Sequence, residues 1–119
     1  MPPYHSYILH LCDRTAWSRS QELGEYRTDS LEQIGFIHCS TVEQVLPVAN
    51  QLYRGRQGLV ALLIDPRRLM AELRWEQVGD QRFPHLYGPL NLDAVVDVVE
   101  VKPNPMGLFD KFPQSNQNP

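Results

Sequence analysis

Apolar stretches separated by polar segments predict the strands of this chain. Residues 7–12 and 59–64 are almost continuously apolar, which is typical of strands covered on both faces. Residues 36–39 and 95–101 are two further strand candidates. Residues 73–77 alternate between apolar and polar side chains, as a strand with one solvated face does. The pattern therefore predicts a sheet in which the 59–64 strand is central.

Helix signals fall between these strands. Asp13 can cap a short helix that ends near Gly24. Residues 30–33 have the spacing of a capping box, and Gly35 follows as a stop. This second helix is therefore expected to be barely one turn long.

The longest predicted helix follows the second strand. Ser40 and Glu43 repeat the capping-box spacing there. Apolar residues then recur at intervals of three and four and share one helix face: Val42, Val45, Leu46, Ala49, Leu52 and Tyr53. Pro47 lies within this pattern and is expected to kink the helix or to confine it to the first turns.

The order of these elements predicts a compact α+β fold with short helices. Strands and helices do not alternate in the β-α-β rhythm of a parallel sheet, because the second half of the chain is mostly strand and loop. With 119 residues and 42% apolar content, the chain suits one domain, which we place at residues 1–101. Residues 102–119 are predicted to form a partly disordered tail with three apolar anchors: Leu108, Phe109 and Phe112.

Charge and cysteine content narrow the function classes. A net charge of −3 and a pI near 5.7 argue against binding of duplex nucleic acid, although a local basic patch of Arg54, Arg56, Arg67 and Arg68 stays open. No apolar run approaches the roughly 20 residues that span a membrane, and the first residues lack the pattern of a signal peptide. Cys12 and Cys39 lie in apolar runs without a Cys-x-x-Cys pair. We therefore expect a cytoplasmic protein with two reduced, buried thiols and no membrane partner.

Two segments set a histidine among apolar or conformationally stiff residues. Residues 35–40 contain His38, and residues 83–91 contain His85 in a loop that Pro84 and Pro89 are expected to brace. We expect both histidines to be partly solvated and to gather at one cleft with three further residues: His10, Ser40 and Tyr87. The alternative is structural, with His38 a core-edge histidine bonded to backbone and residues 83–91 a rigid loop.

Other residues supplement this candidate site. Ser40 falls where a strand meets a helix, so exposed backbone N–H groups there could bind a phosphate, with Gln44 one turn further along. The histidines and cysteines show no metal-ligand spacing, and the chain has no nucleophile elbow, P-loop or dinucleotide-binding glycine motif. We therefore expect neither a metal site nor a Ser-His-Asp or Cys-His triad.

These segments resemble a known family. Residues 35–40, Gln44 and four segments, 48–50, 59–65, 73–76 and 83–95, together resemble the DUF952 family, small bacterial proteins of unknown function. The likeness extends over nearly the whole chain to about Val101. It implies a split β-sheet fold similar to ADP-ribosyltransferases and RNA 2′-phosphotransferases, with a cleft for NAD or an ADP-ribose-like group. It also implies a first-strand histidine on the ribose, for which His10 is in place, and a late-strand acid, for which Glu76 and Glu100 are candidates.

The resulting hypothesis is a cleft that binds or transforms NAD, ADP-ribose or another phosphate-bearing nucleotide. His38 and His85 are the candidate catalytic residues, with His85 acting on a proton. The candidate ligand-binding residues are His10, Trp17, Tyr26, Ser40, Gln44 and Tyr87, in which the aromatic rings would stack. The alternative is a non-catalytic ligand-sensing or interaction module, and a carboxylate beside the ribose would favour the enzyme. The oligomeric state stays open.

Overall fold

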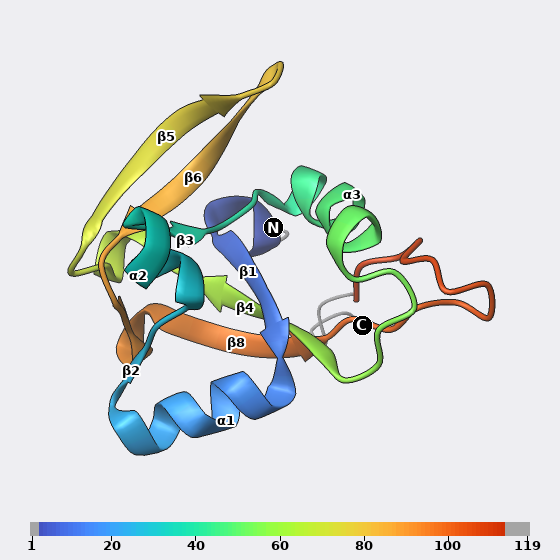
Figure 1. The fold of residues 1–119 in the computed structure, drawn as a ribbon, viewed down its shortest axis with the longest axis horizontal. Helices are drawn as coiled ribbons and strands as arrows, with labels where there is room; N and C mark the ends of the chain where they lie inside the picture. Colours follow the sequence, from blue (N-terminus) through green and yellow to red (C-terminus); the bar gives the residue numbers. More distant parts are fainter. Residues whose placement is uncertain (1–2, 114–119) are drawn as a thin grey trace.

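The computed structural model describes residues 3–113 and shows two antiparallel three-stranded sheets with helices around them (Figure 1). The central sheet has the order β1-β4-β8, with β1 at Ile8–Asp13, β4 at Leu59–Ile64 and β8 at Val95–Glu100. The second sheet has the order β3-β6-β5, with β3 at Ile37–His38, β6 at Gln81–Tyr87 and β5 at Glu72–Val78. This arrangement confirms the predicted α+β class and the central place of residues 59–64.

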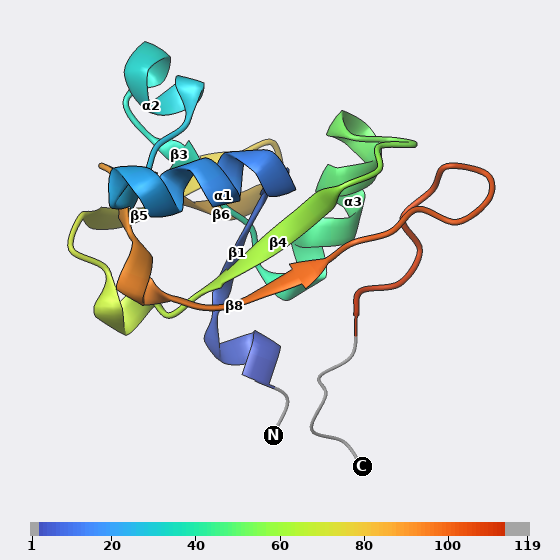
Figure 2. The same ribbon diagram turned by 90° about the horizontal axis from the view of Figure 1, so that it is seen from below.

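The remaining elements are short and connect the two sheets. The helices are α1 (Arg14–Leu23), α2 (Asp29–Ile34) and α3 (Val42–Leu52). A two-residue ribbon joins β2 (Glu25–Tyr26) to β7 (Leu90–Asn91), and there are 3₁₀ turns at Pro3–Ser6, Pro66–Arg68 and Leu92–Ala94. Figure 1 shows the β5–β6 hairpin projecting at the upper left with α3 to its right, and Figure 2 shows α1 and α3 apart from each other, with α3 on the right. None of the helices within residues 3–113 is long and apolar enough to cross a membrane.

Strands β1 and β4 of the central sheet are buried on both faces, because their successive side chains enter two different cores. Ile8, Val60 and Leu62 belong to the first core, which includes Ile37 and Leu86 of the second sheet. The neighbouring residues along β1 and β4 belong to the second core, which includes α3 and the C-terminal segment: Leu9, Leu11, Leu59, Ala61 and Leu63. The nearly continuous apolar runs of these strands have this double burial as their cause.

Two helix starts differ by one or two residues from the predicted ones. The cap of α2 is Thr28, whose hydroxyl accepts from Leu31 N–H, rather than Ser30. The cap of α3 is Thr41 with Gln44, in a complete capping box, rather than Ser40 with Glu43. Ser40 cannot be the cap because its backbone pairs with Leu9, so the helix can begin only after it.

The glycine that was expected to end α1 does end it, whereas the proline inside α3 does not end that helix. Gly24 ends α1 at φ +86°, in the left-handed region where glycine is favoured, and this confirms the predicted stop. Pro47 lies inside α3, yet the helix continues to Leu52. The expectation that Pro47 confines the helix to its first turns is therefore wrong. Burial of Val45 and Ala49 against the central sheet holds the helix together past the proline.

His85 lies in strand β6, so the prediction that it belongs to a braced loop is wrong. Pro84 is also part of that strand and pairs with Trp75 in β5. The carbonyl of Pro84 accepts from Cys39 N–H at 3.1 Å, so its missing N–H group faces the β3 side rather than β5. The proline therefore removes no bond from the longer ladder with β5, and β3, on the side that its nitrogen faces, has already ended at His38.

The C-terminal segment packs against α3 as far as the structure describes it. Phe109 is buried in the second core, and the side chain of Asn50 bonds to both its backbone N–H and its carbonyl. Phe112 also packs against this core, so two of the three predicted apolar anchors are in place, whereas Leu108 is half-buried and belongs to neither core. Residues 114–119 of the predicted tail lie outside the described residues.

Candidate functional site

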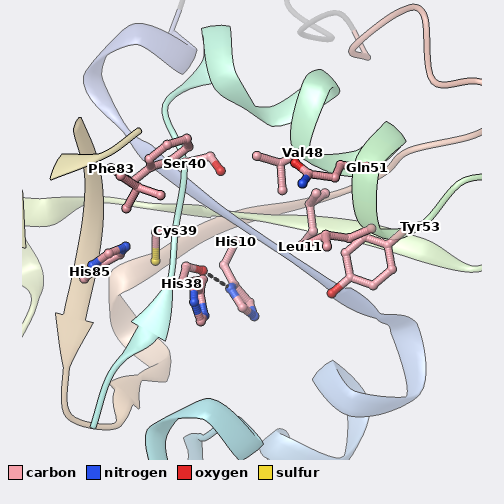
Figure 3. A pocket seen from close by; sticks show the side chains of 12 residues that line it. His10, Leu11, His38, Cys39, Ser40, Val48, Gln51, Tyr53, Phe83 and His85 are labelled. Atoms are coloured by element: carbon pink, nitrogen blue, oxygen red, sulfur yellow. Dashed lines mark hydrogen bonds between the residues drawn. The ribbon is translucent and has the colours of Figure 1, made fainter. Parts of the chain in front are cut away.

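A cavity of about 260 Å³ lies between the second sheet (β3-β6-β5), β1 and α3 (Figure 3). Its polar lining residues are His10, His38, Ser40, Gln51 and His85. The apolar lining residues are Leu11, Cys39, Val48, Leu52, Tyr53, Val78 and Phe83. The structure therefore brings together four of the five residues that were expected to share a cleft.

The cavity continues into an open groove of about 730 Å³ beside α1. The two spaces share five lining residues: His10, Leu11, His38, Leu52 and Tyr53. The groove adds residues of α1, β2 and the loop before α2, including Arg19, Tyr26 and Arg27. The candidate site is thus a small, mostly apolar cavity joined to a larger groove whose lining is less apolar.

Strand register places His38 directly opposite His85. The two residues are partners in the β3–β6 pairing, and their ring centroids are 5.6 Å apart at an interplanar angle of 71°. Phe36, on the same face of the sheet, stacks on His85 with centroids 4.1 Å apart. His38 is exposed, as expected, whereas His85 is only 5% exposed, so the expectation of partial solvation is wrong for His85.

A carboxylate holds His85 from the neighbouring strand. Glu76 Oε1 accepts from His85 Nδ1 at 2.8 Å and from the Tyr87 hydroxyl at 2.7 Å. These bonds, with that of His85 the larger contributor, lower the pKa of the Glu76 carboxyl. The guanidinium of Arg74 lies 4.2 Å from the centroid of the Tyr87 ring. Tyr87 therefore lies behind His85, between Arg74 and Phe36, and does not line the cavity.

His10 is bound to protein through both ring nitrogens. A backbone carbonyl can only accept, so Nδ1 donates to the His38 carbonyl, and Nε2 then accepts from the Tyr26 hydroxyl at 2.9 Å. Burial lowers the pKa of His10 to about 4. His10 is therefore a neutral imidazole that joins β1, β2 and β3 at the junction of cavity and groove (Figure 3).

His38 presents the most accessible imidazole of the three. Burial of part of the ring, together with the nearby His85, lowers the pKa of His38. Within residues 3–113, no side-chain hydrogen bond fixes its ring nitrogens, and only its backbone carbonyl is bound, by His10. His38 can therefore bind a ligand without first breaking a bond inside the protein.

Of the other predicted ligand-binding residues, Ser40 lines the cavity, whereas Gln44 and Trp17 do not. Ser40 is buried at the cavity wall, and its backbone exchanges two 2.8 Å hydrogen bonds with Leu9, so its N–H group is not open to a phosphate. Gln44 closes the α3 capping box and donates to the Arg82 carbonyl, outside the cavity. Trp17 packs half-buried against the first core and lines neither space.

Sequence reasoning did not find the α3 side of the cavity or the role of Glu76. Val48, Gln51 and Leu52 belong to a helix whose apolar spacing indicated only core packing. Glu76 was one of two candidate acids, and the pairing of β5 with β6 places it beside His85. Glu100 lies on β8, pairs with Arg14 and Lys102, and lines neither space. Within residues 3–113, no cluster of His, Cys, Asp or Glu is arranged to hold a metal ion.

Fold and site define a small α+β protein with a histidine-lined cleft beside the junction of two antiparallel sheets. The chain belongs to the DUF952 family of proteins of unknown function, whose model matches residues 11–98. It is similar to the crystal structure of protein CC0527 from Caulobacter crescentus, with 31% identity and a TM-score of 0.77 over 86% of this chain and 91% of that one. The solution NMR structure of CC0527 gives 29% identity and a TM-score of 0.76 over 87% and 91%. No curated protein matches the chain.

Proposed function

We propose that the cleft binds a nucleotide-like small molecule of the NAD or ADP-ribose type and supports transferase-like chemistry on it. The observation that carries this proposal is His85, which lines the cavity next to His38 while a carboxylate holds its other ring nitrogen. A histidine paired in this way is suited to proton transfer. The fold likeness to ADP-ribosyltransferases is part of the same proposal.

The two joined spaces suit the two chemical halves of such a ligand. The cavity is mostly apolar with a few convergent polar groups, which fits a planar ring and a sugar. In the groove Arg19 fits phosphate, whereas Arg27 is held by ion pairs with Glu25 and Glu32. Its volume of about 730 Å³ lies within the roughly 300–1,000 Å³ of small-molecule sites.

A small-molecule ligand also agrees with the surface charge. Arg56 forms an ion pair with Asp13, and Arg67 and Arg68 both pair with Asp65. Three of the four arginines of the basic patch are thus paired with a carboxylate, and the proposal includes neither duplex nucleic acid nor membrane as a partner. The proposal locates the protein in the cytoplasm, where Cys12 and Cys39 stay reduced.

A second candidate function is ligand binding without turnover. No Asp or Glu is among the residues that line the cavity, and Glu76 reaches it only through His85. A ligand-sensing module would need nothing more than this. Turnover of a bound ligand separates the two candidates.

The test is a thermal-shift and calorimetry series with NAD, ADP-ribose, mononucleotides and phosphorylated RNA ends. We expect at least one ligand to raise the Tm at millimolar concentration. His38→Ala should weaken its binding and leave the Tm of the free protein near that of the parent, because His38 is exposed.

Leu62→Ala is the matched stability control. Leu62 is fully buried in β4, so its truncation should cost about 2–5 kcal/mol of the free energy of unfolding and leave the ligand dissociation constant unchanged. The proposal fails if no ligand shifts the parent, or if His38→Ala destabilises the protein as much as Leu62→Ala does.

A further inference from the structure

The Glu76 carboxylate fixes which nitrogen of His85 carries a proton. A carboxylate oxygen bound to both a tyrosine hydroxyl and an imidazole accepts from both, so His85 Nδ1 is the donor. Nε2 is then the nitrogen left to gain or lose a proton. Within residues 3–113, no hydrogen bond occupies it.

The contrast with His10 shows that this arrangement is not simply what a buried histidine requires. His10 is equally buried, and the protein binds both of its nitrogens, one at the His38 carbonyl and one at the Tyr26 hydroxyl. His85 has one nitrogen bound and one left unbonded at a cavity wall. A purely structural histidine would have been satisfied twice, as His10 is.

Several contacts hold the His85 ring and its carboxylate in place. Phe36 stacks on one face of the ring at an interplanar angle of 16°. Tyr87 holds the same oxygen of Glu76, and the Arg74 guanidinium covers the Tyr87 ring. Glu76, His85 and Tyr87 all belong to one hairpin, so their spacing is set by a single strand pair.

We propose that Glu76 is a positioning residue that keeps His85 protonated at Nδ1, so that Nε2 exchanges a proton with a hydroxyl of the bound ligand. Hydroxyl-bearing ligands are the class that fits, because no Lys or Arg within the described part of the chain lines the cavity. In the step itself, the ligand O–H bond breaks, its proton forms a bond to Nε2, and the Nδ1 proton stays between His85 and Glu76. The inference rests on the proposed function for its ligand but not for its tautomer.

The experiment is long-range ¹H–¹⁵N NMR of ¹⁵N-histidine protein across pH, with Glu76→Gln as the test variant. In the neutral parent, we expect the ring proton of His85 to be on Nδ1. In Glu76→Gln the side-chain amide can also donate, so a substantial Nε2–H population of His85 should appear. Affinity for ADP-ribose, the probe, should fall by about tenfold or more, by analogy with the loss of the carboxylate that orients a metal-bound histidine.

Glu43→Gln is the matched control. Glu43 forms the other glutamate–histidine pair of the described chain, with His5 at 3.0 Å, and both side chains are exposed. This substitution should change the His5 signals and leave both His85 and ADP-ribose affinity as in the parent.

Each outcome decides a separate question. Protonation of His85 at Nε2 in the neutral parent, or unchanged His85 signals in Glu76→Gln, overturns the inference whether or not ADP-ribose binds. A parent with the expected tautomer that binds no nucleotide overturns the proposed function alone. If Glu76→Gln does not fold, Tyr87→Phe replaces it. This variant keeps the carboxylate, so His85 should keep its Nδ1–H form, and a change to Nε2–H would overturn the inference.

Discussion

Three histidines lie within one site, yet burial and hydrogen bonding give each a different chemistry. His10 is buried and bound at both nitrogens, His85 is buried and bound at one, and the exposed His38 is held by no side-chain bond within the described chain. Composition cannot distinguish these three states. The neighbours that do so are not adjacent in sequence, because Tyr26 lies 16 positions from His10 and Glu76 lies 9 positions from His85.

The buried, neutral His10 predicts that acid destabilises the fold. Its pKa is about 4 in the folded protein and 6.5 as its ordinary value. Between these values the unfolded chain takes up a proton that the folded chain does not, so the free energy of unfolding falls as pH decreases from 6.5 to 4. The loss from this one residue is about 3 kcal/mol.

Urea unfolding of the parent and of His10→Gln at several pH values measures this effect. The variant should be less stable at pH 7 and should lose less stability on acidification. His5→Gln, at an exposed histidine, is the control and should keep the slope of the parent. Equal slopes in all three proteins would contradict the assignment.

The two thiols are predicted to react slowly. Cys12 and Cys39 are free and buried, as the sequence indicated, and burial raises the pKa of Cys12 to about 11 and that of Cys39 to about 12. Little thiolate is therefore present at neutral pH. Alkylation of the native protein should proceed far more slowly than alkylation in denaturant, and comparable rates would show that the sites open readily.

At the scale of elements, strands were predicted better than their partners. Strands β1 and β4 could be read from the sequence because burial on both faces requires continuous apolar runs, and β8 could be read from its valines although none of its residues is fully buried. Strand β6 was missed because a proline such as Pro84 usually argues against a strand. The strand can contain Pro84 because its nitrogen faces β3, which is only two residues long. His38 lies opposite His85 because of the β3–β6 strand register, which cannot be predicted from either segment alone.

Helix α3 provides a prediction on capping. Thr41 accepts from Gln44 N–H, and the Gln44 side chain accepts from Thr41 N–H, so both ends of the capping box are made. Thr41→Ala should lower the free energy of unfolding by about 1 kcal/mol. The control is Thr15→Ala, at an exposed position of α1, where the change should stay within about 0.5 kcal/mol. Chemical denaturation compares the two, and equal effects would show that the box contributes nothing.

At the scale of the whole molecule, the C-terminal segment covers one face of α3. Phe109 enters the second core, so Phe109→Ala should cost about 3–5 kcal/mol of unfolding free energy. Met106, in the same segment, is 80% exposed, and Met106→Ala should leave stability unchanged. Thermal or urea unfolding tests both, and a stable Phe109→Ala variant would show that the segment only rests on the surface.

The short passage from His38 to Ser40 joins the two sheets, because Cys39 bonds to Pro84 of β6 and Ser40 bonds to Leu9 of β1. This connection between the two sheets bears on the order in which the molecule folds. The Glu76, His85 and Tyr87 contacts span only 9 and 11 positions, whereas the contact of His10 with His38 spans 28. Local hairpins close faster than distant strands meet. The carboxylate-bound histidine is therefore expected to form early in refolding, and the cleft it serves is completed only when residues 9 and 40 meet.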